Sequence, residues 1–346
     1  MFILLSCSLR SEHLIMTLAV IAVYANCYDV DDSNKITAGN VVLSPGGVAR
    51  NIADAIGRLQ SNNPPYFIGA IGNDSAGTLL WNSLEHVNRD GILLTKNCKT
   101  ACCAIEIEGL HGPTFAVNDM DIHKLITPKM IYEHEGIISK SSVLIFDANI
   151  PLETMKAILV LCMKHEITVW FEPTDWNIVT KPFTLNLKNA ITYISPNFKE
   201  LRLLSQYLTG KTYESDSLYR NLNTLLENAR DYALQVLPFV PNIVVTLGKY
   251  GVLMVKKNSN NPEIMFYEST EQHNKENVFG VGDCMASGYI VAMQNGLPVE
   301  QCISVGMNTA LQSVISPQTI PETLSYGFLT KSPQMFELPL TGRIYL

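Results

Sequence analysis

The sequence predicts an α/β protein with a mainly parallel sheet covered by helices on both faces and a small β lid. Between residues 143 and 247, short apolar runs alternate with helical segments. Strands that alternate with helices along a chain build a parallel sheet with helices on its two faces. The chain has 346 residues, 47% of them hydrophobic, which is long enough to bury one large core.

The first strand of this sheet is expected at residues 18–23, which read Leu-Ala-Val-Ile-Ala-Val. A continuous apolar run of this length is typical of a buried parallel strand. A signal peptide is the alternative interpretation, but no positive charge precedes the first apolar stretch. The N-terminal apolar stretch as a whole is interrupted by Arg10, Glu12 and His13, so it is too short and too interrupted to span a membrane. We therefore expect a cytoplasmic protein that does not contact a membrane.

The later elements follow from local patterns. A Pro-Gly-Gly turn precedes a helix whose buried stripe is Val48, Ile52, Ile56 and Leu59, at helical spacing. Over 98–119, apolar and polar residues alternate weakly and two glycines are present, which predicts exposed hairpin strands. Together with residues 30–43, these strands would form the lid. The other expected strands are 66–71, 143–146, 168–171, 190–194 and 243–247, and the other expected helices are 152–164 and a segment from Lys199.

Composition excludes some classes of function. The net charge is −7 without runs of like charge, so binding of nucleic acid through its phosphates is not expected. The eight cysteines are scattered, and none lies in a Cys-x-x-Cys pair. This pattern predicts free thiols in a reducing compartment rather than disulfides or a zinc site.

The late motif Gly280-Val281-Gly282-Asp283 carries the strongest chemical signal. Two glycines one residue apart let successive N–H groups converge, and the apolar stripe after them starts a helix whose positive end attracts an anion. Asp283, at the edge of that site, could take a proton from an attacking hydroxyl group. The alternative is a tight turn with Asp283 as a helix cap, and the motif alone does not decide between them.

An earlier motif contains Gly46, Gly47 and Asn51. The glycines would let a ligand approach the backbone, and the Asn51 amide offers both a donor and an acceptor to a polyhydroxy ligand. Taken alone, this motif is better explained as a chain break before an amphipathic helix.

Together the two motifs resemble the two signatures of the PfkB, or ribokinase-like, sugar and nucleoside kinases. The resemblance extends from about residue 18 to residue 325 and implies a ribokinase-like three-layer α/β/α sandwich. We expect a kinase domain over 14–330, an N-terminal extension over 1–13 and a C-terminal tail over 331–346. A homodimer formed through the lid is a further expectation.

The resemblance also assigns roles to individual residues. It implies that Asp283 is the general base and that the N–H groups of Gly280, Val281 and Gly282 stabilise the transferring phosphoryl group. Asn197-Phe198-Lys199-Glu200 is similar to the Asn-x-x-Glu that holds hydrated Mg²⁺, so Asn197 and Glu200 would bind the metal through water. The implied nucleotide-site residues are Asn197, Glu200, Thr246, Gly248 and Gly251, and the implied acceptor-site residues are Asp29, Gly46, Gly47 and Asn51.

Within the family, the segments 44–53, 118–122, 147–151 and 170–174 are most similar to pseudouridine kinases. This implies transfer of a phosphoryl group from ATP, with Mg²⁺, to the 5′-hydroxyl of pseudouridine; whether a monovalent cation is required stays open. One alternative is another nucleoside or sugar as acceptor, such as inosine, adenosine or ribose. The other is an inactive nucleoside-binding relative, because residues 23–29 lack the two glycines that the family has before its ribose-binding aspartate.

Overall fold

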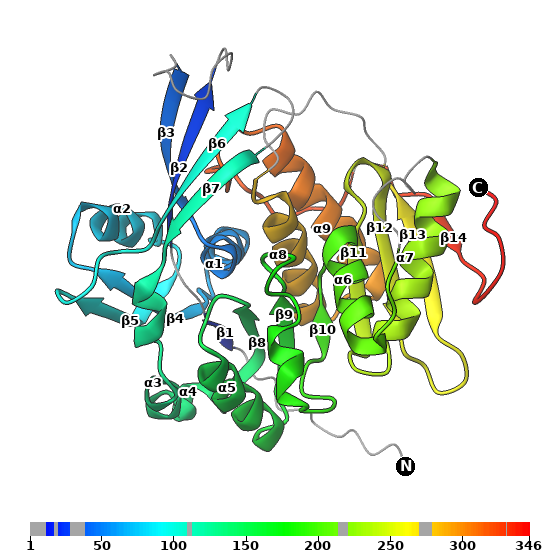
Figure 1. Cartoon of the computed structure of the whole chain (residues 1–346), viewed down its shortest axis with the longest axis horizontal. Helices are drawn as coiled ribbons and strands as arrows, with labels where there is room; N and C mark the ends of the chain where they lie inside the picture. Colours follow the sequence, from blue (N-terminus) through cyan, green and yellow to red (C-terminus); the bar gives the residue numbers. More distant parts are fainter. Residues whose placement is uncertain are drawn as a thin grey trace.

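A computed structural model describes residues 12–16, 20–27, 39–108, 113–213, 221–269, 279–329 and 331–346. They form two sheets, one of ten strands and one of four (Figure 1). The larger sheet is the body of the protein, and the smaller one rises from it beside helix α2 (Ser75–Ser83).

The ten-stranded sheet has the order β14-β13-β12-β11-β10-β9-β8-β1-β4-β5. Neighbours from β5 to β11 pair in parallel, and β12, β13 and β14 add an antiparallel edge. The strands are β1 (Glu12–Met16), β4 (Tyr66–Gly72), β5 (Asn88–Thr95), β8 (Ser141–Asp147), β9 (Thr168–Glu172), β10 (Tyr193–Ile194), β11 (Asn242–Thr246), β12 (Gly251–Lys256), β13 (Glu263–Glu268) and β14 (Met335–Glu337).

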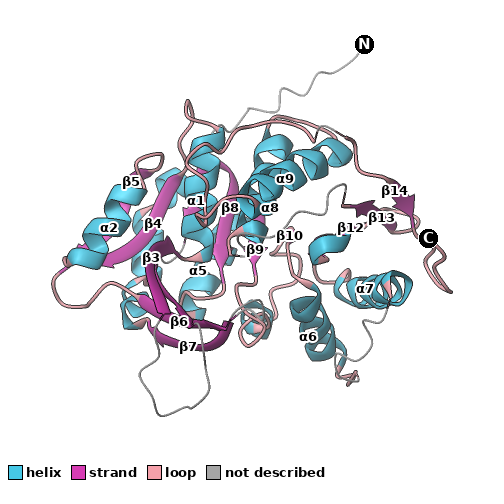
Figure 2. Ribbon diagram, turned by 90° about the horizontal axis from the view of Figure 1, so that it is seen from above, coloured by secondary structure: helices cyan, strands magenta, loops and turns pink. Residues whose placement is uncertain are grey.

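Both faces of this sheet are buried under helices (Figure 2). In β8, Leu144 and Phe146 belong to one core cluster while Val143 and Ile145 belong to another, because successive side chains of a strand point to opposite faces. The first face packs against α3 (Pro128–Glu133), α4 (Glu135–Ile138), α5 (Leu152–Lys164), α6 (Phe198–Thr209) and α7 (Leu222–Val236), and the second against α1 (Val48–Leu59), α8 (Val281–Gln294) and α9 (Val299–Val314). The predicted three-layer α/β/α sandwich is confirmed.

The four-stranded sheet has the order β3-β2-β6-β7 and corresponds in position to the predicted lid. Its strands are β2 (Val20–Cys27), β3 (Gly39–Gly46), β6 (Cys102–Glu108) and β7 (Pro113–Asp119). Strand β3 runs directly into α1, with only Gly47 between them. The lid is therefore joined to the helix that carries the early motif.

The predicted first strand was wrong. Residues 18–23 overlap β2, which belongs to the lid, and the central position between β4 and β8 is taken by β1. The segment that became β1 reads Glu-His-Leu-Ile-Met, so it is less apolar than residues 18–23, and its pairing with β4 and β8 is what places it in the larger sheet. The expected strand over 190–194 is also shorter than predicted, because only Tyr193 and Ile194 pair with neighbouring strands.

Both ends of the described chain contribute strands to the ten-stranded sheet. Strand β1 begins at Glu12, inside the segment expected as an N-terminal extension. Within residues 331–346, β14 pairs with β13, and Arg230 Nη1 donates to the carbonyl oxygens of Pro339 and Gly342 at 3.2 and 2.9 Å. In the part of the chain that the structure describes, none of the helices is both long and apolar enough to cross a bilayer.

Candidate active site

The late motif forms the N-terminus of α8. Gly280 is the N-cap with φ of +75°, and a Cβ there would lie 2.5 Å from the Thr319 carbonyl oxygen, so this position requires glycine. The first intrahelical bond runs from Cys284 N to Gly280 O at 2.8 Å. The N–H groups of Val281 and Gly282 therefore have no acceptor within the helix and can bind an anion. A Cβ at Gly282 would meet no atom within 4 Å, so space is open beside it.

Asp283 lies in the first turn of α8 and is 8% exposed. Its Oδ2 accepts a hydrogen bond of 2.6 Å from Nδ2 of Asn51. Burial raises the pKa of Asp283 to about 7, although the Asn51 hydrogen bond and the nearby Arg50 charge favour the ionised form. A carboxylate with a pKa near neutrality is a suitable general base at physiological pH.

The early motif forms the start of α1 and lies against the late one. Gly46 ends β3, and Gly47 is the N-cap of α1 with φ of +97°, a backbone conformation that favours glycine. Asn51 follows in the first turn of α1 and is 5% exposed. The structure thus brings Gly46, Gly47 and Asn51 together with Asp283, across more than 230 residues of sequence.

Asn197 and Glu200 form a capping box at the start of α6. Glu200 N donates to Asn197 Oδ1 at 3.0 Å, and Asn197 N donates to Glu200 Oε2 at 2.8 Å. Burial, together with the nearby charges of Asp175 and Asp283, raises the pKa of Glu200 to about 7, although its hydrogen bonds with Asn197 favour the ionised form. Glu200 and Asp283 therefore influence each other electrostatically, although they come from different helices.

The remaining predicted nucleotide residues lie at the end of β11 and in the turn that follows it. Thr246 ends β11 and forms a parallel bridge with Asn197. Gly248 begins the short 3-10 helix η4 (Gly248–Tyr250), with φ of +59°. Gly251 has φ of +124°, and a Cβ there would lie 2.1 Å from the Tyr267 carbonyl oxygen. This turn therefore depends on its glycines.

Two acidic residues at this edge of the sheet were given no role from the sequence. Glu172 ends β9 and accepts hydrogen bonds from the Ser195 hydroxyl and from Trp170 Nε1. Burial, together with the charges of Asp283 and Glu200, raises the pKa of Glu172 well above its usual range. Asp147 ends β8, is fully buried and raises the pKa of Asp283. Each lies at the end of a buried parallel strand, and this position is the signal in the sequence that could have identified both residues.

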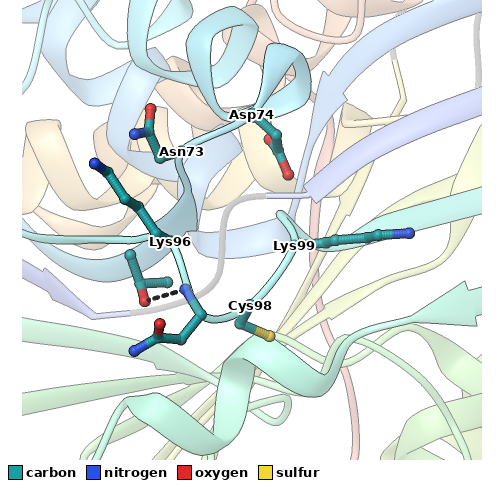
Figure 3. A pocket seen from close by; sticks show the side chains of 7 residues that line it. Asn73, Asp74, Lys96, Cys98 and Lys99 are labelled. Carbon is teal, nitrogen blue, oxygen red and sulfur yellow. Dashed lines mark hydrogen bonds between the residues drawn. The ribbon is translucent and has the colours of Figure 1, made fainter.

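Some predictions and surface features lie outside this cluster. Asp29, expected in the acceptor site, lies outside the described residues. A hollow of about 190 Å³ lies at the start of the lid and is lined by residues such as Asp74, Lys96 and Lys99 (Figure 3). Asp74 there caps α2 and accepts hydrogen bonds from Thr100, so its role is structural. None of the predicted site residues lines this hollow.

The fold and the site define a class of protein. A parallel α/β sheet, two glycine-rich helix starts that meet and a buried carboxylate between them describe a phosphotransferase with an alcohol group as acceptor. The family model for pfkB family carbohydrate kinases matches residues 13–324. The chain belongs to this family.

Known proteins agree with this assignment. The chain is 25% identical to a pseudouridine kinase of Arabidopsis thaliana, over 94% of this chain and 96% of that protein. It is also 25% identical to a pseudouridine kinase of Escherichia coli, over 79% of each chain. Among solved structures, Arabidopsis thaliana ribokinase complexed with ribose and ATP superposes with a TM-score of 0.73 at 17% identity, covering 90% of this chain and 96% of that one. The last similarity shows the fold.

Proposed function

We propose that this chain transfers the γ-phosphoryl group of ATP to the 5′-hydroxyl of pseudouridine. The observation that carries the proposal is the buried 2.6 Å contact between Asn51 and Asp283, which joins the acceptor motif to the base motif. The choice of acceptor is supported by the two pseudouridine kinases that match most of the chain. The solved ribokinase with bound ATP supports the choice of donor.

In this mechanism the 5′-hydroxyl oxygen attacks the γ-phosphorus while the bond from that phosphorus to the bridging oxygen of ADP breaks. The hydroxyl proton goes to Asp283. The N–H groups of Gly280, Val281 and Gly282, at the positive end of α8, stabilise the charge that develops on the phosphoryl oxygens. The open space beside Gly282 is where we place that group.

The acceptor is held by Gly46, Gly47 and Asn51, with Asp29 as the fourth proposed contact. Nδ2 of Asn51 carries two protons, and one of them is used by Asp283. The other remains for a ribose hydroxyl. Asn51 would therefore bring the acceptor and its base to the same point.

The donor side is formed by Asn197, Glu200, Thr246, Gly248 and Gly251. Described residues contain no group of three or more His, Cys, Asp or Glu side chains arranged to hold a metal ion directly. Burial disfavours the charged form of Glu200, and a hydrated divalent cation nearby, which would also bind phosphate oxygens, would offset that cost. We propose that Asn197 and Glu200 hold Mg²⁺ through water. When bound, Mg²⁺ would neutralise charge on the ATP phosphates.

The test is a panel of acceptors offered with Mg-ATP, with ADP release as the measurement. Uridine is the matched control for pseudouridine, since it has the same atoms but an N-glycosidic bond. We expect the highest kcat/KM with pseudouridine. A higher value with ribose, inosine or adenosine would reassign the acceptor within the family. No turnover with any acceptor would support the inactive nucleoside-binding relative instead.

The site of action in the cell is a further part of the proposal. The six cysteines whose side chains the structure describes are all free thiols. Free thiols suit a reducing compartment, so we propose that the enzyme acts in the cytoplasm.

A further inference from the structure

We propose that Arg50 is a positioning residue of this kinase, which acts through the Asn51 amide to hold the carboxylate of Asp283 in place. The inference rests on the proposed role of Asp283 as general base. It assigns a function to a buried arginine that the proposed mechanism does not otherwise use.

The Arg50 guanidinium is fixed from several sides. It is 2% exposed, its Nη2 donates to the Pro45 carbonyl oxygen at 2.7 Å, and its Nε donates to the Gly46 carbonyl oxygen at 3.3 Å. Its Nη1 lies 3.3 Å from Oδ2 of Asp54, with which it forms a buried ion pair. A planar group held at three positions in this way cannot turn freely.

The same guanidinium donates from Nη2 to Oδ1 of Asn51. This contact sets the direction of the amide, because a guanidinium only donates and must therefore face the amide oxygen. The amide nitrogen of Asn51 then points the other way, where it donates to Oδ2 of Asp283. An ionised carboxylate only accepts, so the two contacts select the same amide orientation.

The consequence for catalysis follows from which oxygen is occupied. With Oδ2 bound by Asn51, Oδ1 of Asp283 is the oxygen left for the acceptor proton. Without Arg50, the amide could turn its oxygen toward Asp283, which would favour the protonated form of the carboxyl group. A protonated carboxyl group cannot act as a base.

The titratable groups that face Asp283 come from five elements: Arg50 of α1, Asp147 of β8, Glu172 of β9, Glu200 of α6 and Cys284 of α8. Arg50 is the only cation among these five groups. The three acidic side chains oppose ionisation of Asp283, so the effect of Arg50 has to be separated from theirs.

The chain offers a matched control in Arg58. Its Nε lies 2.9 Å from Oδ1 of Asp54, so it belongs to the same ion-pair network as Arg50. Arg58 donates to Asp54 and to the Glu322 carbonyl oxygen rather than to Asn51. Asp54 therefore keeps one arginine when either arginine is replaced. Arg50→Met and Arg58→Met remove comparable charges, and only the first also removes the contact with Asn51.

The experiment measures the titration of Asp283 directly. Protein labelled with ¹³C at the aspartate carboxyl carbons is titrated without substrate, and the resonance missing from Asp283→Asn assigns the group. We expect Arg50→Met to raise the pKa of Asp283 by about one unit, the size of one lost hydrogen bond to a charged group. Arg58→Met should leave the titration near that of the wild type. No shift in Arg50→Met, or equal shifts in both variants, would overturn the proposal.

Two further variants separate positioning from charge and from misfolding. In an Asn51→Ala background, Arg50→Met should cause a much smaller additional shift; an undiminished shift would mean that Arg50 acts by its charge alone. Arg50→Lys keeps the charge and the fold but lacks the planar fork, so the pKa of Asp283 should still rise. A wild-type titration in Arg50→Lys would contradict the positioning role.

Turnover gives the second readout. With the acceptor that the panel identifies, Arg50→Met should lower kcat about tenfold or more, and the KM for the acceptor should also rise, because the turned Asn51 amide would lose its contact with the ribose hydroxyl. Failure of the proposed function would appear differently, as wild-type protein that titrates as described but turns over no acceptor. The titration therefore tests Arg50 whether or not pseudouridine is the substrate.

Discussion

Replacing Asp283 with asparagine is the most direct test of the catalytic assignment. The substitution keeps the size of the side chain and leaves an oxygen that can accept the hydrogen bond from Asn51. It removes only the ability to take a proton. We therefore expect kcat to fall while the Kd for the acceptor stays within a few-fold of the wild-type value.

The expected magnitude follows from the environment of the carboxylate. Burial raises the pKa of Asp283 from 3.8 to about 7, which brings its basicity close to the working pH. A positioned general base of this kind typically contributes about 10²- to 10⁴-fold to the rate. This corresponds to about 3–5 kcal/mol of transition-state stabilisation.

The pH profile identifies the group that is responsible. Only ionised Asp283 accepts a proton, so the kcat/KM for Mg-ATP should rise with pH through about 7 in the wild type. Burial also raises the pKa of Glu200 to about 7, so Glu200→Gln is the necessary control and should keep this limb. Asp283→Asn should lose it. An Asp283→Asn enzyme with more than about a tenth of the wild-type kcat, or with an unchanged pH limb, would refute the assignment of Asp283 as the base.

Three other outcomes follow from the structure. The folded pKa of Asp283 lies above the unfolded value of 3.8, so the folded protein binds more protons between about pH 4 and 7 and loses stability as pH rises through that window. Asp283→Asn should therefore be about 2–4 kcal/mol more stable than the wild type to urea at pH 8, and this difference in stability should narrow toward pH 4. Gly280→Ala should lower the free energy of unfolding by about 1–3 kcal/mol of strain and so unfold at a lower temperature. Gly282→Ala should keep the wild-type melting temperature but lose turnover, because its methyl group would enter the space we assign to the phosphoryl group. Leu43 of β3 and Val117 of β7 lie in one row across the lid and are 62% and 54% exposed. If two copies pair through the lid, Leu43→Lys should sediment as a monomer, whereas wild-type protein that already sediments as a monomer would contradict the dimer.

The body of the fold could be predicted because its strands are buried on both faces. Residues 143–146 are a continuous apolar run and residues 169–171 are apolar after Thr168, and these segments became β8 and β9. The first strand could not be predicted in the same way. Residues 18–23 form the longer apolar run, whereas β1 has only Leu14, Ile15 and Met16 after two polar residues, and the partners that make it a central strand are 50 or more residues away. Local hydrophobicity does not contain that information.

The candidate site, like the fold, could be predicted from the sequence only in part. Glycine spacing indicated where α1 and α8 begin, and the acidic residue after the late glycines is the base that we propose. The contact between Asn51 and Asp283 could not be inferred from spacing, because it depends on how α1 and α8 pack on one face of the sheet. The place of Glu172 beside Asp283 and Glu200 was missed for a related reason: a single carboxylate at the end of a strand is informative only when others are found beside it.

The order of residues in the early motif has a geometric explanation. Strand β3 of the lid ends at Gly46, and the positive φ of Gly47 turns the chain sharply into α1. One helical turn later, Arg50 reaches back to the carbonyl oxygens of Pro45 and Gly46. Asn51 is the next residue, about 100° further around the helix, and so faces α8 and Asp283. Seven consecutive residues thus connect the end of the lid to the proposed base, and a change in the position of β3 would reach Asp283 through side chains that are already in contact.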